Sequence, residues 1–328
     1  MFNATRQDFE RVYTENGLTA PPSPAVPKTG ARPVSAAAAA GTKSLKADPA
    51  PHWVVYHNAW RAGGPPPVAD VAGFNAFIIT FLLTSGPFDM ALEWANIGAD
   101  ARAAKKAEYN DAGIKLMISA FGATDHPTTA GADPVSLANT MAQYVKDYNL
   151  DGIDVDWEDF DAMAAGTGEN WLIAFTTQLR SQLPSADGYI ITHAPVTPWF
   201  TPTLYPGGGY LKVHQEVGSL IDWYNLQFYN QGTSEYVTCE GLLDASSSSW
   251  PETAIFEINA NGVSHDKLVI GKPAAFVNAN NGHMEPGLLA ECVGSAKERG
   301  WNGGAMAWQY PDAQAEWIRT VRSLSWPV

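Results

Sequence analysis

The sequence is poor in cysteine, in basic residues and in long apolar runs, and each shortage excludes a class of protein. Cys239 and Cys292 are the only cysteines among 328 residues, so a small fold held together mainly by disulfide bonds is excluded. Whether these two residues pair with each other cannot be decided from the sequence. The fold must instead depend on its own core, for which the 45% of hydrophobic residues are sufficient.

The shortage of basic residues argues against a nucleic-acid partner. The chain has 20 Lys and Arg against 34 Asp and Glu, a formal net charge of −14, whereas a phosphate backbone requires a basic patch. No apolar run reaches the roughly 18–20 residues of a membrane span, so we expect no membrane partner. The first residues (MFNATRQDFERVYTENG) lack a basic stretch followed by an apolar one, so we expect no secretory signal there. A cytoplasmic protein or a secreted one that has been trimmed are both compatible with this, and we expect a monomer.

The composition changes sharply near residue 52. Residues 19–51 are rich in proline and alanine, a composition typical of a linker or a surface arm. We therefore expect an N-terminal extension over residues 1–52 and one folded catalytic domain over residues 53–328.

From Trp53 onward, short apolar runs alternate with segments of helical pattern. The expected strands are 53–58, 76–82, 114–120, 150–158, 189–195, 221–229, 267–273 and 303–308. The expected helices are 98–112, 134–148, 169–183, 252–261, 286–299 and 312–323. Runs of this kind indicate a parallel sheet, and eight repeats close into a single (β/α)8 barrel of the TIM type. An open doubly wound sheet is the alternative, but no glycine fingerprint follows the first strand, and we interpret Gly207–Gly209 as a flexible turn in a long loop.

The fourth expected strand carries three carboxylates on one face. Side chains alternate along a strand, so Asp154, Asp156 and Glu158 point into the barrel while the apolar residues between them point outward. Buried carboxylates raise one another's pKa, which favours a protonated acid near neutral pH. Such an acid can protonate the leaving oxygen of a glycosidic bond. A metal site would need convergent ligands such as paired histidines, which the scattered histidines do not provide, so we expect no metal and no cofactor.

The segment from Asp151 to Glu158 (DGIDVDWE) resembles the DGxDxDxE signature of family 18 glycoside hydrolases, the chitinases and the related endo-β-N-acetylglucosaminidases. Residues 227–230 (QFYN) look like the sixth-strand segment of plant and fungal chitinases, and residues 303–308 (GGAMAW) look like the last strand of the family. Residues 119–122 (SAFG) stand where the family usually carries SxGG, and the middle pair departs from that pattern. The resemblance covers roughly residues 53–325.

The resemblance implies substrate-assisted catalysis, in which the acetamido oxygen of the sugar is the nucleophile. Glu158 would be the general acid and base, and Asp156 would stabilise the oxazolinium ion through the acetamido N–H. Asp154 would modulate the charge of Asp156, and Tyr229 would donate a hydrogen bond to the acetamido oxygen. Trp308 would form the floor under the scissile sugar.

Other residues of these motifs are expected to bind substrate or to support the fold. Asn225 and Gln227 share a face with Tyr229, and together with Asn230 we expect them to contact the sugar. Asp151 is an odd number of residues away from each of the three carboxylates, so its side chain points to the other face of the strand. We therefore interpret it, with Gly152, as a structural part of the motif.

Three functions compete for this sequence. The first is a chitinase that cuts β-1,4 bonds between N-acetylglucosamine units, and the short segment from Pro273 to Pro286 suggests an open cleft that suits endo cutting. The second is an endo-β-N-acetylglucosaminidase that cuts the chitobiose core of N-glycans. The third is an inactive lectin or inhibitor on the same barrel, but such proteins typically lose the last acid of the motif and Glu158 is present.

Overall fold

The computed structural model describes residues 49–328. The extension expected over residues 1–52 lies outside the described residues except for residues 49–52. The first strand begins at His52, one residue before the expected start of the catalytic domain. All the described residues belong to one compact unit, which spans Leu45 to Val328.

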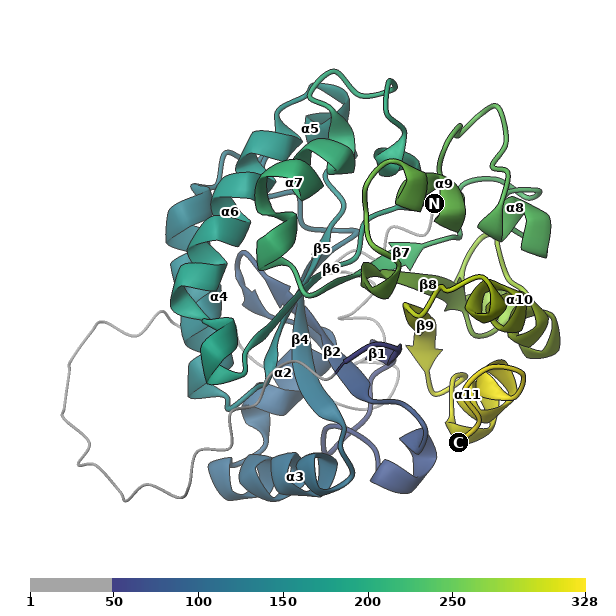
Figure 1. Cartoon of the computed structure of the whole chain (residues 1–328). Helices are drawn as coiled ribbons and strands as arrows, with labels where there is room; N and C mark the ends of the chain where they lie inside the picture. Colours follow the sequence, from purple (N-terminus) through teal and green to yellow (C-terminus); the bar gives the residue numbers. More distant parts are fainter. Residues whose placement is uncertain (1–48) are drawn as a thin grey trace. The chain divides into compact units, whose positions relative to one another are not determined.

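The described chain forms a closed barrel of eight parallel strands, surrounded by helices (Figure 1), which confirms the predicted fold class. The strands are β1 (His52–His57), β2 (Ala76–Leu83), β4 (Lys115–Gly122), β5 (Gly152–Trp157), β6 (Ile190–His193), β7 (Trp223–Gln227), β8 (Leu268–Pro273) and β9 (Gly304–Tyr310). A short strand, β3 (Gly86–Pro87), pairs antiparallel with the end of β2. Each of the eight expected strands corresponds to one strand of the barrel.

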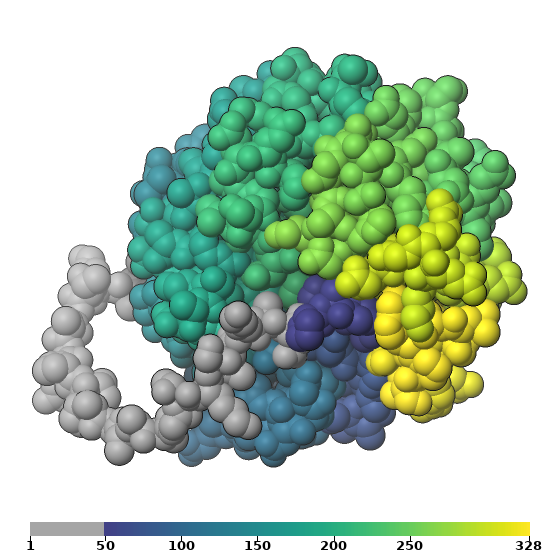
Figure 2. Space-filling model, in the orientation of Figure 1, coloured from purple at the N-terminus to yellow at the C-terminus, as the bar shows by residue number. Residues whose placement is uncertain are grey.

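The barrel closes because β1 pairs with both β2 and β9. Val54 lies opposite Ala76 on one side and opposite Met306 on the other. In the space-filling view, the purple segment near residue 50 accordingly lies beside the yellow C-terminal segment (Figure 2).

The helices between the strands are partly those that the sequence predicts. They are α2 (Asp89–Asn96), α3 (Ala99–Asp111), α4 (Pro134–Asp147), α5 (Phe160–Ala164), α6 (Gly168–Gln182), α7 (Gly209–Val217), α8 (Cys239–Leu243), α9 (Ile255–Ala260), α10 (Pro286–Glu298) and α11 (Ala315–Arg322). The six expected helices correspond to α3, α4, α6, α9, α10 and α11, whereas α2, α5, α7 and α8 were not expected.

The interpretation of Gly207–Gly209 as a turn holds only in part, because Gly207 lies in a turn whereas Gly209 begins α7. The Gly209 N–H donates to Glu169 Oε1 over 2.8 Å. A Cβ on Gly207 would lie 2.2 Å from the other carboxylate oxygen of Glu169. The glycines therefore allow the backbone to approach a buried carboxylate at the start of a helix.

Alternation along each strand separates two apolar layers. On β1, Val54 and Tyr56 belong to a cluster inside the barrel, whereas Trp53 and Val55 belong to the larger core between strands and helices. Polar side chains on the inner face are buried beside this inner apolar cluster, so we expect them to form hydrogen bonds with one another.

A disulfide bond joins Cys239 in α8 to Cys292 in α10, which settles the question that the sequence leaves open. Their Cα atoms are 5.0 Å apart, a distance within the normal range for a disulfide. The bond attaches the segment that follows β7 to the helix that follows β8. Among the described residues, no helix combines the length and the apolar character needed to cross a membrane.

Candidate active site

Three carboxyl groups follow one another at the C-terminal end of β5, as the sequence predicts. Asp154 and Asp156 lie on the inner face with 0% and 4% of their surface exposed, and Glu158 follows directly after the strand and is half-buried. Ile153 and Val155 point outward into the core beneath the helices. In this fold family, the C-terminal end of the strands is the face that carries active sites.

Asp154 is held by four hydrogen bonds from four other strands. Its Oδ2 accepts from Tyr56 Oη and Ser119 Oγ, each over 2.8 Å. Its Oδ1 accepts from Thr192 Oγ1 over 2.6 Å and from Asn225 Nδ2 over 3.1 Å. Burial raises the pKa of Asp154, and these hydrogen bonds oppose that effect by stabilising the charged form.

Asp156 and Glu158 share a single amide. Gln227 Nε2 lies 2.9 Å from Asp156 Oδ1, 3.3 Å from Glu158 Oε1 and 2.9 Å from the carbonyl oxygen of Ala194. An amide has only two N–H donors, so this pair of carboxyls is less well satisfied than Asp154. Gln227 therefore fixes the orientation of both groups without neutralising them.

The pair retains a proton to a higher pH than isolated carboxyls would. Burial raises the pKa of Asp156 well above its usual range, and the charges of Glu158 and Asp154 raise it further. Burial also raises the pKa of Glu158, against the hydrogen bonds from Gln227 and Asp156. Two carboxyls at this spacing cannot both ionise easily, so one proton remains between them.

Tyr229, in the loop after β7, lies near the carboxyls, and Trp308 of β9 packs beside Tyr56 at a ring-centroid distance of 5.7 Å. Tyr229 is only 6% exposed, and it belongs to the inner apolar cluster against which the half-buried Trp308 packs. Burial and the nearby charges of Asp156 and Glu158 raise the pKa of Tyr229 well above its usual value. Its hydroxyl therefore remains protonated and able to donate a hydrogen bond.

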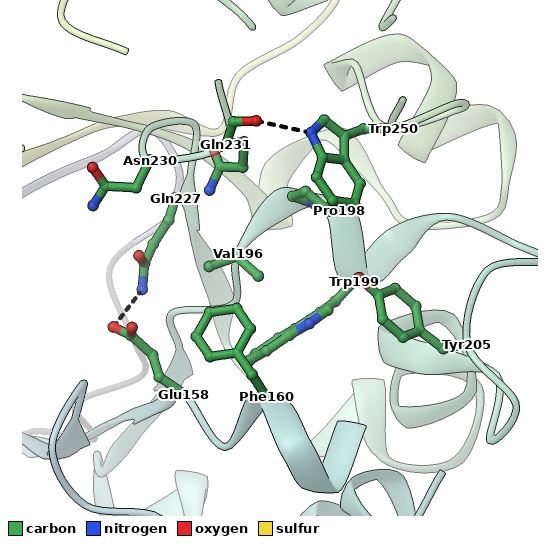
Figure 3. Close-up of a pocket in the computed structure, with 10 residues that line it drawn as sticks. All are labelled: Glu158, Phe160, Val196, Pro198, Trp199, Tyr205, Gln227, Asn230, Gln231 and Trp250. Carbon is green, nitrogen blue, oxygen red and sulfur yellow. Dashed lines mark hydrogen bonds between the residues drawn. The ribbon is translucent and has the colours of Figure 1, made fainter. Parts of the chain in front are cut away.

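A pocket opens beside Glu158 (Figure 3). Aromatic side chains from the loops after β5, β6 and β7 form much of its wall, and its lining is Glu158, Phe160, Val196, Pro198, Trp199, Tyr205, Gln227, Asn230, Gln231 and Trp250. Glu158 is the one carboxylate in this set. The Trp250 Nε1–H donates to the carbonyl oxygen of Gln231 over 3.1 Å, while Gln231 Oε1 is buried without a partner. The pocket thus combines aromatic faces with the carboxyl group of Glu158.

Two of the expected substrate contacts lie in different environments. Asn230 is exposed and lines the pocket, and its Oδ1 accepts from the Asn280 N–H over 2.8 Å. Asn225 is completely buried and bonds Tyr56 and Asp154 instead. A position below the pocket fits a positioning role for Asn225 rather than the sugar contact expected from the sequence.

Asp151 and Gly152 lie at the opposite end of β5. Asp151 accepts from the backbone N–H of Leu116 over 2.6 Å and forms an ion pair with Lys106 over 2.7 Å. A Cβ on Gly152 would lie 2.0 Å from the carbonyl oxygen of Ile190, so only glycine allows β5 and β6 to pair here. Both residues contact the framework of the barrel and not the pocket.

The sequence did not single out Tyr56 and Thr192, although both hold Asp154. Alternation gives a usable signal, because each is a polar residue on the inner face of an otherwise apolar strand. The pocket residues Tyr205 and Trp250 stand in loops, and Phe160 begins the short helix α5, so no periodicity indicates where their side chains point. His193, by contrast, points outward to Thr176 and Tyr210, and burial lowers its pKa to about 3.

Within residues 49–328, no group of three or more His, Cys, Asp or Glu side chains is placed to hold a metal ion.

Comparison with known proteins gives a consistent family assignment. The sequence model described as "Glycosyl hydrolases family 18" matches residues 52–318. A chitinase of Enterococcus faecalis is 27% identical over 54% of the chain, and the match spans only about half (53%) of that protein. Endochitinase 4 of Metarhizium robertsii is 29% identical over 78% of the chain and 81% of that protein.

Solved structures show the same fold. A family 18 chitinase from Pseudoalteromonas aurantia has a TM-score of 0.67 and 26% identity over 84% of the chain and 100% of that protein. A fungal endo-β-N-acetylglucosaminidase of family 18 has a TM-score of 0.62 over 84% of the chain and 98% of that protein, and its 20% identity extends the likeness to the fold alone.

Proposed function

Because the chain belongs to glycosyl hydrolase family 18 and is therefore a glycoside hydrolase, we propose that it is a chitinase that cuts β-1,4 bonds inside chains of N-acetylglucosamine. We further propose that it does so with retention of configuration, by substrate-assisted catalysis. The observation that carries this proposal is the position of Glu158, half-buried on the pocket wall, with a pKa raised by burial and with Asp156 beside it.

Glu158 acts first as the general acid. Its carboxyl group donates a proton to the glycosidic oxygen, and the bond between that oxygen and the anomeric carbon breaks as the leaving sugar departs. The acetamido carbonyl oxygen of the same substrate attacks the anomeric carbon and forms an oxazolinium ion. This route needs no protein nucleophile, because the attacking oxygen belongs to the substrate.

Asp156 and Tyr229 stabilise the intermediate. Asp156 accepts a hydrogen bond from the acetamido N–H as that group becomes positive, and Asp154 remains below it as a fixed negative charge. Tyr229, which stays protonated, donates to the acetamido oxygen and directs it towards the anomeric carbon. Trp308 lies beneath the sugar, and Gln227 keeps Asp156 and Glu158 oriented.

Water completes the reaction. The Glu158 carboxylate removes a proton from a water molecule, the hydroxyl oxygen adds to the anomeric carbon, and the oxazolinium ring reopens to the acetamide. Glu158 is protonated again and ready for the next cycle. The two successive inversions at the anomeric carbon give net retention.

The short segment after β8 supports cleavage inside the sugar chain rather than at its end. Only residues 274–285 separate β8 from α10, so no additional subdomain stands between these late elements. The aromatic pocket beside Glu158 lies where the leaving portion of the substrate would be bound, and aromatic faces suit sugar rings. An open cleft with binding surface on the leaving side accommodates a chain that continues in both directions.

Products from two substrates test the proposal. We would incubate the protein with the hexamer of N-acetylglucosamine and, separately, with a high-mannose N-glycoprotein, and analyse both by mass spectrometry. Dimers to tetramers from the hexamer, with the glycoprotein intact, support an endo-acting chitinase. A glycoprotein trimmed to one core N-acetylglucosamine, with the hexamer intact, would replace the proposal with an endo-β-N-acetylglucosaminidase. Absence of cleavage with retained sugar binding would indicate an inactive lectin.

A further inference from the structure

Lys272 is a buried cation that the proposed chemistry does not use. It stands near the C-terminal end of β8, and its side chain is completely buried. None of the ion pairs described for residues 49–328 includes Lys272, and burial lowers its pKa well below the usual value. A buried charge without a carboxylate partner is costly, so its surroundings must supply other strong acceptors.

Three backbone carbonyl oxygens supply them. Lys272 Nζ lies 2.8 Å from the oxygen of Phe228, 2.7 Å from that of Tyr236 and 3.1 Å from that of Gly282. An ammonium group has three N–H donors, and each has one acceptor here. Phe228 and Tyr236 belong to the segment after β7, and Gly282 belongs to the segment after β8. Lys272 therefore links two loops that are more than forty residues apart in sequence.

The first of the two linked loops, the one after β7, carries Tyr229 and Asn230. Phe228 directly precedes Tyr229, and a Cβ on Gly282 would lie 2.6 Å from Tyr229 Cα, so Gly282 packs directly on the tyrosine backbone. The Asn230 N–H also donates to the carbonyl oxygen of Asn281 over 3.2 Å. The backbone on both sides of Tyr229 is thus tied to the second loop, with Lys272 at the base.

We propose that Lys272 is a positioning residue for the hydrolysis reaction, holding the Phe228 and Gly282 carbonyls so that the Tyr229 hydroxyl meets the acetamido group. This inference rests on the proposed function, because it assigns Tyr229 a contact with substrate. Lys272 does not touch the substrate itself. Its effect passes through the backbone, and small displacements of a reacting group are enough to slow catalysis strongly.

Lys267 offers a matched control on the same side of the barrel. It precedes β8, and its ammonium group also donates to backbone carbonyls, those of Gly218 and Ile221. These contacts lie at the N-terminal end of the strands, away from the candidate active site. Lys267→Met and Lys272→Met therefore remove the same kind of interaction from opposite ends of the barrel.

The test is a double-mutant cycle on chito-oligosaccharide hydrolysis, with kcat, KM and Tm measured for each variant. We expect Lys272→Met to lower kcat by about 10–100-fold with little change in KM, and Lys267→Met to leave kcat near the wild-type value even if both lower Tm. Combining Lys272→Met with Tyr229→Phe should be no slower than Tyr229→Phe alone, because the two changes remove the same contribution. Lys272→Arg, which keeps the charge and its donors, should recover part of kcat.

Other outcomes separate failure of this inference from failure of the proposed function. If Tyr229→Phe leaves kcat unchanged, the proposed role of Tyr229 is wrong. Two results with a slow Tyr229→Phe variant would make Lys272 only structural. In the first, Lys272→Met and Lys267→Met change kcat by the same factor. In the second, the losses of kcat caused by Tyr229→Phe and Lys272→Met multiply in the double variant. Should Lys272→Met fold too poorly to assay, amide hydrogen exchange of Lys272→Gln, whose amide has only two N–H donors for the three carbonyls, is compared with wild type over residues 228–238 and 279–284. Unchanged exchange in both segments overturns the inference.

Discussion

Asp154 and Asp156 are two residues apart on one strand, yet their surroundings give them different properties. Asp154 has four hydrogen-bond donors for its two oxygens, whereas Asp156 shares the amide of Gln227 with Glu158. Asp154 can therefore remain charged at the base of the site, and the mobile proton belongs to the pair above it. This division provides both an acid and a stabilising anion at neutral pH.

Substitution of the acid gives the most direct test at this scale. Glu158→Gln removes the proton donor but keeps the size of the side chain, so we expect kcat to fall by about 10²–10⁴-fold. Tm and the affinity for chito-oligosaccharides, measured by calorimetry, should change little. A variant that retains near wild-type turnover would assign the acid to another group.

The pH dependence tests the coupling between Asp156 and Glu158. The raised pKa of the pair keeps Glu158 able to donate a proton, so kcat/KM of the wild type should fall as pH rises through that pKa. Asp156→Asn removes one of the two groups that share the proton, so Glu158 titrates alone and the alkaline limb should move to lower pH. We also expect kcat to fall by about 10²–10³-fold, because the oxazolinium ion loses its partner. An alkaline limb at the wild-type position would show that the two groups titrate independently.

At the scale of elements, the end of β4 departs from the glycine-rich family pattern. Phe121 has a φ of +77°, a region that bulky residues rarely adopt, and Gly122 follows with a φ of +72°. The Phe121 ring is buried against Trp171 and Phe175, with centroid distances of 5.9 and 5.5 Å. Packing of the ring therefore offsets backbone strain that a glycine would avoid.

Two substitutions at Phe121 separate packing from strain. Both Phe121→Ala and Phe121→Gly should destabilise the protein by about 3–5 kcal/mol through loss of the buried ring. Phe121→Gly should be the more stable of the two by about 1 kcal/mol, because alanine still strains this backbone and glycine does not. Urea unfolding of both variants compares their free energies of unfolding. If Phe121→Ala is the more stable variant, as alanine usually is relative to glycine, the positive φ carries no cost.

The repeating elements of the barrel could be predicted because their periodicity reflects burial. The three carboxylates at β5 could be assigned to one face for the same reason, because the intervening Ile153 and Val155 are apolar and must occupy the outward face of the strand. Helix α7 was missed because its start contains glycines, whose purpose is the approach to Glu169 and cannot be seen in a local pattern. The pocket wall and the three contacts of Lys272 depend on loop paths that bring distant segments together, and no spacing in the sequence encodes these.

The disulfide between α8 and α10 gives a prediction for the elements that follow β7. It closes a segment with a sequence separation of 53, so replacing both Cys239 and Cys292 with Ala should cost about 2–4 kcal/mol of stability. For a protein of this size, we expect Tm to fall by roughly 3–6 °C. Thermal unfolding with and without a reducing agent supplies the control, because the reductant should lower Tm of the wild type alone. Equal sensitivity of both proteins would mean that the bond contributes nothing.

At the scale of the whole molecule, the catalytic unit can be tested for independence from the N-terminal region. All the strands and helices of the barrel lie between His52 and Arg322. A chain that begins at residue 49 should therefore fold with a Tm within about 2 °C of the full chain, and it should cleave the hexamer of N-acetylglucosamine at a similar rate. A large loss of either property would make residues 1–48 part of the catalytic unit and would revise the proposed domain boundary.

The four bonds of Asp154 come from β1, β4, β6 and β7, whereas most of the pocket wall comes from the segments that follow the strands. The catalytic carboxyls are thus attached to the part of the barrel that tolerates the least change, and the surfaces that select the sugar are attached to the part that tolerates the most. Mutation during evolution, or loop grafting in the laboratory, can alter the preferred glycan without rebuilding the acid. On the proposed function, exchange of these segments is the change that we expect to alter the preferred glycan while the buried carboxyls stay in place.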